Sequence, residues 1–354
     1  MAWRPTELPS SISELQFQPD WASAYGRLVT LERQYLDGLA RLPQTQHTKK
    51  DQTVLEMHVM SIRIVGWLFK VFEGDMCRSE LARSIHSCQS EEKLLDSGLF
   101  ICDYFLRAFW KSQGRIPSDS SHPSRPSFDV QREVFEDTLV EAPKSHSSAK
   151  KQLRLYDLAM LLSTPALPRS IKLEDVEKNP AAVKVPFCKL ECAHILSESI
   201  NQDIHKDDNK KEWAASVWKI FEHFGRGDIL HELKGPLVHR LENILSLCAD
   251  LHDPFDTLDI WLEHVGNARY YSDDGIIEFT TPDEKAYPLP SRRYIQLHAA
   301  ACQVAHLSGA VDYFEKIDRA LDEDGVLAED GHQMYVLADR LRQVICPAYG
   351  LEHL

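Results

Sequence analysis

Apolar residues recur at intervals of three and four positions through the first third of the 354-residue chain, which is the spacing of one helix face. The pattern predicts helices over residues 21–39, 52–73 and 91–111, which together form a helical N-terminal region, 21–111. Residues 1–20 lack the pattern and predict an irregular arm. The third helix carries an aromatic stripe that we expect to lie in the core, with the lining of a hydrophobic ligand pocket as the alternative: Phe100, Tyr104, Phe105, Phe109 and Trp110.

The helical pattern then gives way to small and polar residues. Residues 112–127 contain six Ser and three Pro, and a basic run, KSHSSAKK, follows at 144–151. Such composition is typical of loops, so we expect a linker over 112–150, with one short helix at 128–140 inside it. Residues 151–169 form a connector to the second half of the chain.

From residue 170 the apolar segments become short, which indicates strands mixed with helices. Residues 170–264 are predicted to contain a ββα unit, with a helix at 212–224, a strand at 243–247 and a helix at 254–264. Residues 265–354 are predicted to form a hairpin at 270–280, turning at Asp274–Gly275, and helices at 291–307 and 310–321. The predicted fold class is therefore α+β, mainly helical with a small ββα unit.

Charge and cysteine usage narrow the function classes. The formal net charge is −14, and residues 171–264 carry 11 Lys and Arg against 18 Asp and Glu, which disfavours a polyanionic substrate. Eight scattered cysteines, no apolar leader and no membrane-length apolar run predict an intracellular protein, cytoplasmic or nuclear, with no membrane partner. The sequence also contains no GxSxG, P-loop, GxGxxG or HExxH motif.

Two segments carry candidate chemistry, LECAHILSESI at 190–200 and LENILSLCADLHDPFDTLDIWLE at 241–263. They place His194, Asn243 and His252 in apolar surroundings, in the order His, Asn, His. Over residues 170–320 the chain resembles the fungal HNH-domain proteins of the ββα-metal nuclease superfamily. In that family one strand carries a general base, a second strand an orienting Asn, and a following helix a metal-binding His.

The resemblance implies an enzyme that hydrolyses phosphodiesters with a divalent metal, Mg²⁺, Mn²⁺ or Zn²⁺. His194 would be the general base, Asn243 would orient it, and His252 would hold the metal. A single His binds a metal ion only weakly, so Asp256, Asp250 or Cys248 must complete the coordination shell. We assign Asp256 as the second metal ligand. Nucleic acid is the substrate that this assignment implies.

Other functions remain open. Metal-dependent members of the family often carry Asp, Glu or His before the first His, where this chain has Ala193. The site could instead serve a cyclase, isomerase or hydrolase of secondary metabolism, acting on a small apolar metabolite, or the unit could be a silent interaction module. A Cys3His zinc centre from Cys188, Cys192, Cys248 and His252 is a further alternative. His298 and His306 share a helix face and predict packing.

Overall fold

The structure is a computed structural model that describes residues 4–13, 18–42, 49–72, 74–110, 190–201, 204–205, 208–266, 269–272, 275–281 and 283–322. The predicted linker 112–150 and the connector 151–169 lie outside these ranges, as do residues 170–189 of the predicted ββα unit. Among the described residues the fold is mainly helical with two small antiparallel sheets, an α+β arrangement as predicted. No helix in these ranges combines the length and apolarity needed to cross a membrane.

Four helices and a short 3-10 turn form the N-terminal half. They are α1 (Pro19–Arg41), α2 (Lys49–Val71), α3 (Asp75–Ser87), α4 (Glu91–Tyr104) and η3 (Leu106–Ala108). Ser90 caps α4 by accepting a hydrogen bond from the backbone N–H of Lys93, which satisfies one of the free donors at that helix start. The aromatic stripe of α4 and η3 is buried, as the sequence predicted.

The second half alternates short helices and strands. In chain order these are β1 (Leu190–His194), η5 (Glu198–Asn201), α8 (Asp208–His223), α9 (Asp228–Leu233), η6 (Gly235–His239), η7 (Leu241–Asn243), β2 (Ile244–Cys248), α10 (Ala249–Asp256), β3 (Glu263–Gly266), β4 (Arg269–Ser272), β5 (Gly275–Glu278), α11 (Arg292–Ser308) and α12 (Ala310–Asp322). The strands β1 and β2 form one antiparallel pair, and β3, β4 and β5 form a separate three-stranded sheet.

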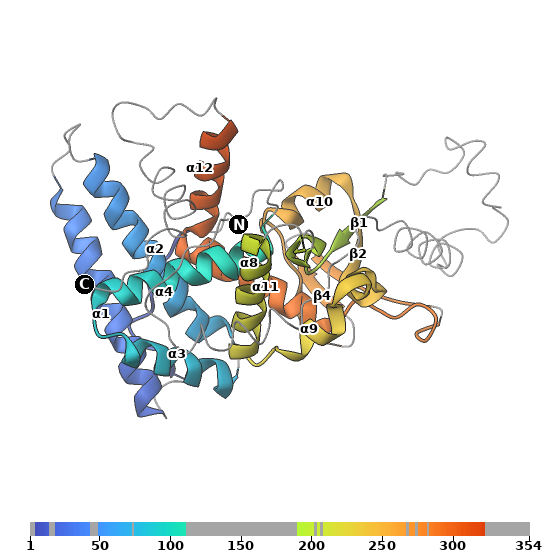
Figure 1. The fold of residues 1–354 in the computed structure, drawn as a ribbon, viewed down its shortest axis with the longest axis horizontal. Coiled ribbons are helices and arrows are strands. Elements are labelled where there is room, and N and C mark those ends of the chain that lie inside the picture. The colour runs from blue at the N-terminus through green and yellow to red at the C-terminus, as the bar shows by residue number, and fades with distance from the viewer. Residues whose placement is uncertain are drawn as a thin grey trace.

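One hydrophobic core runs through both halves, from Leu8 to Ile317. Helix α11 packs against α2, η3, α12 and β3, so it connects the N-terminal helices to the second half. Figure 1 shows α1 to α4 on one side of the molecule and β1, β2 and α10 on the other, with α11 between them. The core therefore fixes the two-stranded sheet against the end of the N-terminal helical region.

The largest departure from the predicted elements concerns residues 254–264. Pro254 was expected near the start of a helix, yet it lies inside α10, which begins earlier and is already complete at Asp256. The chain then turns at Leu258, whose φ is 61°, and β3 takes the residues from Glu263 onward. Helix α3 was not predicted, and the turn of the 270–280 hairpin at Asp274 lies outside the described residues.

Candidate functional site

The strands β1 and β2 and the helix α10 bring two predicted site residues together. In the antiparallel pairing, His194 at the end of β1 lies opposite Ile244 at the start of β2. Helix α10 follows β2 directly and packs against both strands. His194 and His252, which are 58 positions apart in sequence, consequently line a single pocket.

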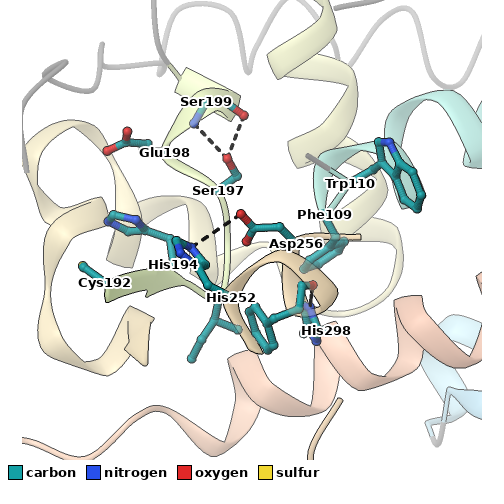
Figure 2. A pocket seen from close by; sticks show the side chains of 12 residues that line it. Phe109, Trp110, Cys192, His194, Ser197, Glu198, Ser199, His252, Asp256 and His298 are labelled. Carbon is teal, nitrogen blue, oxygen red and sulfur yellow. Dashed lines mark hydrogen bonds and ion pairs between the residues drawn. The ribbon is translucent and has the colours of Figure 1, made fainter. Parts of the chain in front are cut away.

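The pocket has a volume of about 240 Å³ and two chemically different walls. Figure 2 shows His194, His252 and Asp256 gathered on one side, with Phe109 and Trp110 on the other. The polar side is formed by Cys192, His194, Ser197, Glu198, Ser199, His252 and Asp256. The remaining lining residues are Phe109, Trp110, Ile195, Phe255 and His298, and no Lys or Arg is found among these described lining residues.

His194 belongs to a cluster that the sequence analysis did not anticipate. Its Nε2 lies 3.0 Å from Nδ1 of His239, the last residue of η6. The same Nδ1 lies 3.5 Å from Oε2 of Glu198. One nitrogen or oxygen from each of the three residues falls within 4.8 Å of the other two, so the group could hold a metal ion.

His252 is held between two carboxylates. Its Nδ1 lies 3.0 Å from Oε2 of Glu191 on β1, and its Nε2 lies 3.5 Å from Oδ2 of Asp256 one helical turn later. When Nδ1 carries the proton and donates it to Glu191, the lone pair of Nε2 faces Asp256. His252 and Asp256, the two predicted metal ligands, thus present one nitrogen and one oxygen toward each other.

Asn243 lies close to the site, but its contacts differ from the expected contact with the His194 ring. Its side chain is fully buried, and both of its N–H groups donate to backbone carbonyls, those of Leu196 and Val238, at 2.9 Å. Its Oδ1 accepts the backbone N–H of Leu196 at 2.9 Å. Because both side-chain N–H groups are used in this way, Asn243 fixes the loop after His194. The His194 ring contacts His239 instead.

The apolar wall of the pocket contains rings that are held by specific contacts. Trp110 donates from Nε1 to Asp318 at 2.9 Å. Phe255 stacks on His298 with ring centroids 3.9 Å apart and an interplanar angle of 8°. His298 also contacts the carbonyl of Phe255 through Nε2 at 3.3 Å, and burial lowers its pKa to about 4. The ring is therefore neutral near pH 7, in keeping with its predicted packing role.

The remaining candidates are His306 and the cysteines of the alternative zinc centre. His306 contacts the carbonyl of Leu258 at 2.9 Å, as expected of a packing residue. Of the proposed Cys3His centre, Cys192 lines the pocket, whereas Cys188 and the side chain of Cys248 lie outside the described residues. The centre therefore stays a prediction.

Glu191, Glu198 and His239 were missed by the sequence analysis. Glu191 and Glu198 lie inside the segment that was singled out, so proximity to His194 was available as a signal. No comparable signal existed for His239, because its approach to His194 depends on the path of η6 and η7.

Comparisons with known proteins add no relative. Neither the profiles of known protein families, nor the curated proteins, nor the solved structures yield a match to this chain.

Proposed function

We propose that the protein is a hydrolase of the ββα-metal type that cleaves a phosphodiester bond with the help of a divalent metal ion. One observation carries the proposal: His194 from the end of β1 and His252 from α10 line the same pocket. A general base and a metal-binding His from a strand and a following helix are the two groups that this reaction type requires.

In this proposal His194 takes a proton from the attacking water. A general base must reach the water and must keep its ring in one orientation. The contact with His239 fixes the orientation of the His194 ring. Its place in the pocket lining lets it reach the water. Asn243 contributes indirectly, since it holds the backbone at Leu196 just beyond the base.

The residues around His252 fit a divalent metal ion. Nε2 of His252 and Oδ2 of Asp256 would hold it, and Glu191 would keep the ring in the required tautomer through Nδ1. Two protein ligands are enough for Mg²⁺ or Mn²⁺, which commonly retain water and bind substrate phosphate oxygens. When bound, the ion would supply positive charge beside the scissile phosphate.

A second candidate is an acid–base enzyme acting on a small apolar metabolite. The aromatic wall of Phe109, Trp110 and Phe255 favours it, as does a pocket whose described lining includes no Lys or Arg. The chain's net charge of −14 points in the same direction, because long polyanions are repelled by such a field. His194 would serve as acid or base in this reaction as well.

The test is cleavage of plasmid and single-stranded DNA and RNA by the full chain, with Mg²⁺, with Mn²⁺ and with EDTA. We expect cleavage that needs metal, disappears with EDTA and falls steeply as salt is raised. His194→Ala should reduce the rate by 10²-fold or more, roughly the share of a general base, whereas the exposed His231→Ala should not. Folded protein that cleaves none of these substrates would contradict the phosphodiester hydrolase and favour the enzyme that acts on a small apolar metabolite.

A further inference from the structure

Three potential metal-ligand atoms, one each from His194, Glu198 and His239, converge beside the pocket. A single proton on His239 cannot form good hydrogen bonds to both of the other two. Nδ1 of His239 is close both to Nε2 of His194, at 3.0 Å, and to Oε2 of Glu198, at 3.5 Å. A single N–H points in one direction, so a proton on Nδ1 is well aimed at only one of these two neighbours. A cation placed among the three atoms would interact favourably with all of them.

The separations also match the dimensions of a coordination shell. Zn²⁺ bonds His nitrogen and carboxylate oxygen at about 2.0–2.2 Å, and tetrahedral angles then place neighbouring ligand atoms about 3.3 Å apart. The separations of His239 Nδ1 from His194 Nε2 and from Glu198 Oε2, 3.0 and 3.5 Å, lie on either side of this value. Two His and one Glu form a ligand set that zinc uses in catalytic sites, where the fourth position stays open.

The three ligands are attached to a scaffold that is already fixed. Asn243 bonds to Leu196, between His194 and Glu198, and to Val238, next to His239. The backbone N–H of Ile195 adds a bond to the carbonyl of Asn243 at 2.9 Å. One buried amide residue therefore holds both ligand-bearing segments at a set distance, which lowers the entropy lost when an ion binds.

We propose that His194, Glu198 and His239 form a binding site for a borderline-soft divalent metal ion, Zn²⁺ above all. The nitrogen-rich donor set suits Zn²⁺ better than Mg²⁺, which prefers oxygen ligands. His194 and Glu198 line the pocket, so an ion held by them would lie at its polar wall. This site goes beyond the proposed hydrolysis. Zinc bound to Nε2 of His194 leaves the ring proton on Nδ1, so the ring has no lone pair left with which to act as a general base. Zinc consequently inhibits the Mg²⁺-dependent reaction.

The test is zinc and cobalt binding by the full chain, measured by calorimetry, by metal analysis after dialysis and by the visible spectrum of bound Co²⁺. We expect one high-affinity ion per chain and a tetrahedral Co²⁺ spectrum. Glu198→Gln and His239→Gln should each raise the zinc Kd at least about tenfold. Loss of a residue that only hydrogen-bonds to a metal ligand already costs about 10- to 100-fold in affinity, and loss of a ligand itself should cost no less. His231→Gln, an exposed control, should leave the Kd unchanged.

Further variants separate this site from its neighbours. Zinc binding that survives His252→Gln and Cys192→Ser supports the three-residue site. Binding that disappears in either of those variants, and is unchanged in His239→Gln, overturns it, as does a folded chain that binds no zinc. Folding of each variant is checked by far-ultraviolet circular dichroism and thermal unfolding.

Activity distinguishes this inference from the proposed function. Normal zinc binding without any cleavage contradicts the hydrolase and leaves the zinc site in place. Metal-dependent cleavage by a chain that binds no zinc supports the hydrolase and contradicts the zinc site. If both hold, added zinc should slow Mg²⁺-dependent cleavage, and His239→Gln should need more zinc for the same inhibition.

Discussion

At the scale of single residues, Asn243 shows how one buried amide can hold two backbone segments together beside the pocket. Its three side-chain hydrogen bonds all join it to the backbone of Leu196 and Val238. The resemblance to the ββα-metal nucleases implied that Asn243 contacts the His194 ring, whereas its side chain bonds to the backbone just beyond His194. The sequence could not indicate these partners, since the Val238 carbonyl is brought close by the turns of η6 and η7.

Asn243→Ala should lower the free energy of unfolding by about 3 kcal/mol, because it leaves buried backbone groups of Leu196 and Val238 without partners. Urea unfolding of both proteins measures the difference. Gln296→Ala removes an exposed amide from α11 and should change stability by less than about 0.5 kcal/mol. Equal effects of the two substitutions would show that the amide of Asn243 has no structural role.

His298 gives a pH dependence whose sign follows from burial. Its pKa falls from 6.5 to about 4 in the folded protein, so the unfolded chain takes up a proton first as the pH decreases. This contribution to stability is complete above pH 6.5 and is lost between pH 6.5 and 4, amounting to about 3 kcal/mol. His298→Gln should flatten the stability profile in that window, measured by urea unfolding at several pH values. An unchanged slope would contradict the assignment.

At the scale of elements, the end of α10 explains why the predicted helix 254–264 was wrong. Leu258 adopts a left-handed conformation with φ 61°, and the N–H of Asp259 bonds to the carbonyl of Pro254 at 2.8 Å. This is the pattern of a helix terminated at a left-handed residue, a position where Gly is usual. A buried Leu there gives no turn signal in the sequence, so the pattern suggested that the helix continues.

This geometry predicts an unusual order of stability among variants of Leu258. Leu258→Ala creates a cavity and keeps the left-handed strain, with an expected loss of about 2–5 kcal/mol. Leu258→Gly creates a slightly larger cavity yet relieves about 1 kcal/mol of strain. The Gly variant should therefore be at least as stable as the Ala variant in urea unfolding. A clearly less stable Gly variant would mean that the backbone relaxes out of this conformation.

Other elements were predictable to different degrees. The helices α1, α2, α11 and α12 follow a local 3.6-residue pattern, so their positions could be predicted closely. Helix α3 shows the same spacing, but it is mostly polar, and its N-cap residue, Gly74, offers no side-chain cap. The convergence of His194 with His239 depends on contacts across 45 residues, for which a single sequence carries no local signal.

At the scale of the whole molecule, the N-terminal arm is fastened to the helices by a buried ion pair. Glu32 on α1 and Arg63 on α2 meet at 2.5 Å with side chains almost excluded from solvent, and Glu32 also accepts the backbone N–H of Leu8 at 2.9 Å. The expected irregular arm of residues 1–20 is thus docked on the core, at least over the described residues around Leu8.

Glu32→Leu should cost about 3–5 kcal/mol of unfolding free energy, since Arg63 would keep a buried charge without its partner. The double variant Glu32→Leu, Arg63→Met removes both charges and should recover part of the loss. Differential scanning calorimetry and urea unfolding measure these two variants and the second single variant, Arg63→Met. A double variant as unstable as the sum of the two single variants would show that the pair is not coupled.

Trp110 has a consequence for how this protein can be studied. Its indole donates a hydrogen bond to Asp318 at 2.9 Å, packs against Phe314 with ring centroids 5.1 Å apart, and lines the apolar wall of the pocket. A fixed indole at the edge of a polar cavity senses changes in local polarity, and the difference between wild-type and Trp110→Phe emission isolates it from the other six tryptophans. The fold thus supplies an intrinsic fluorescent reporter for whatever occupies the pocket.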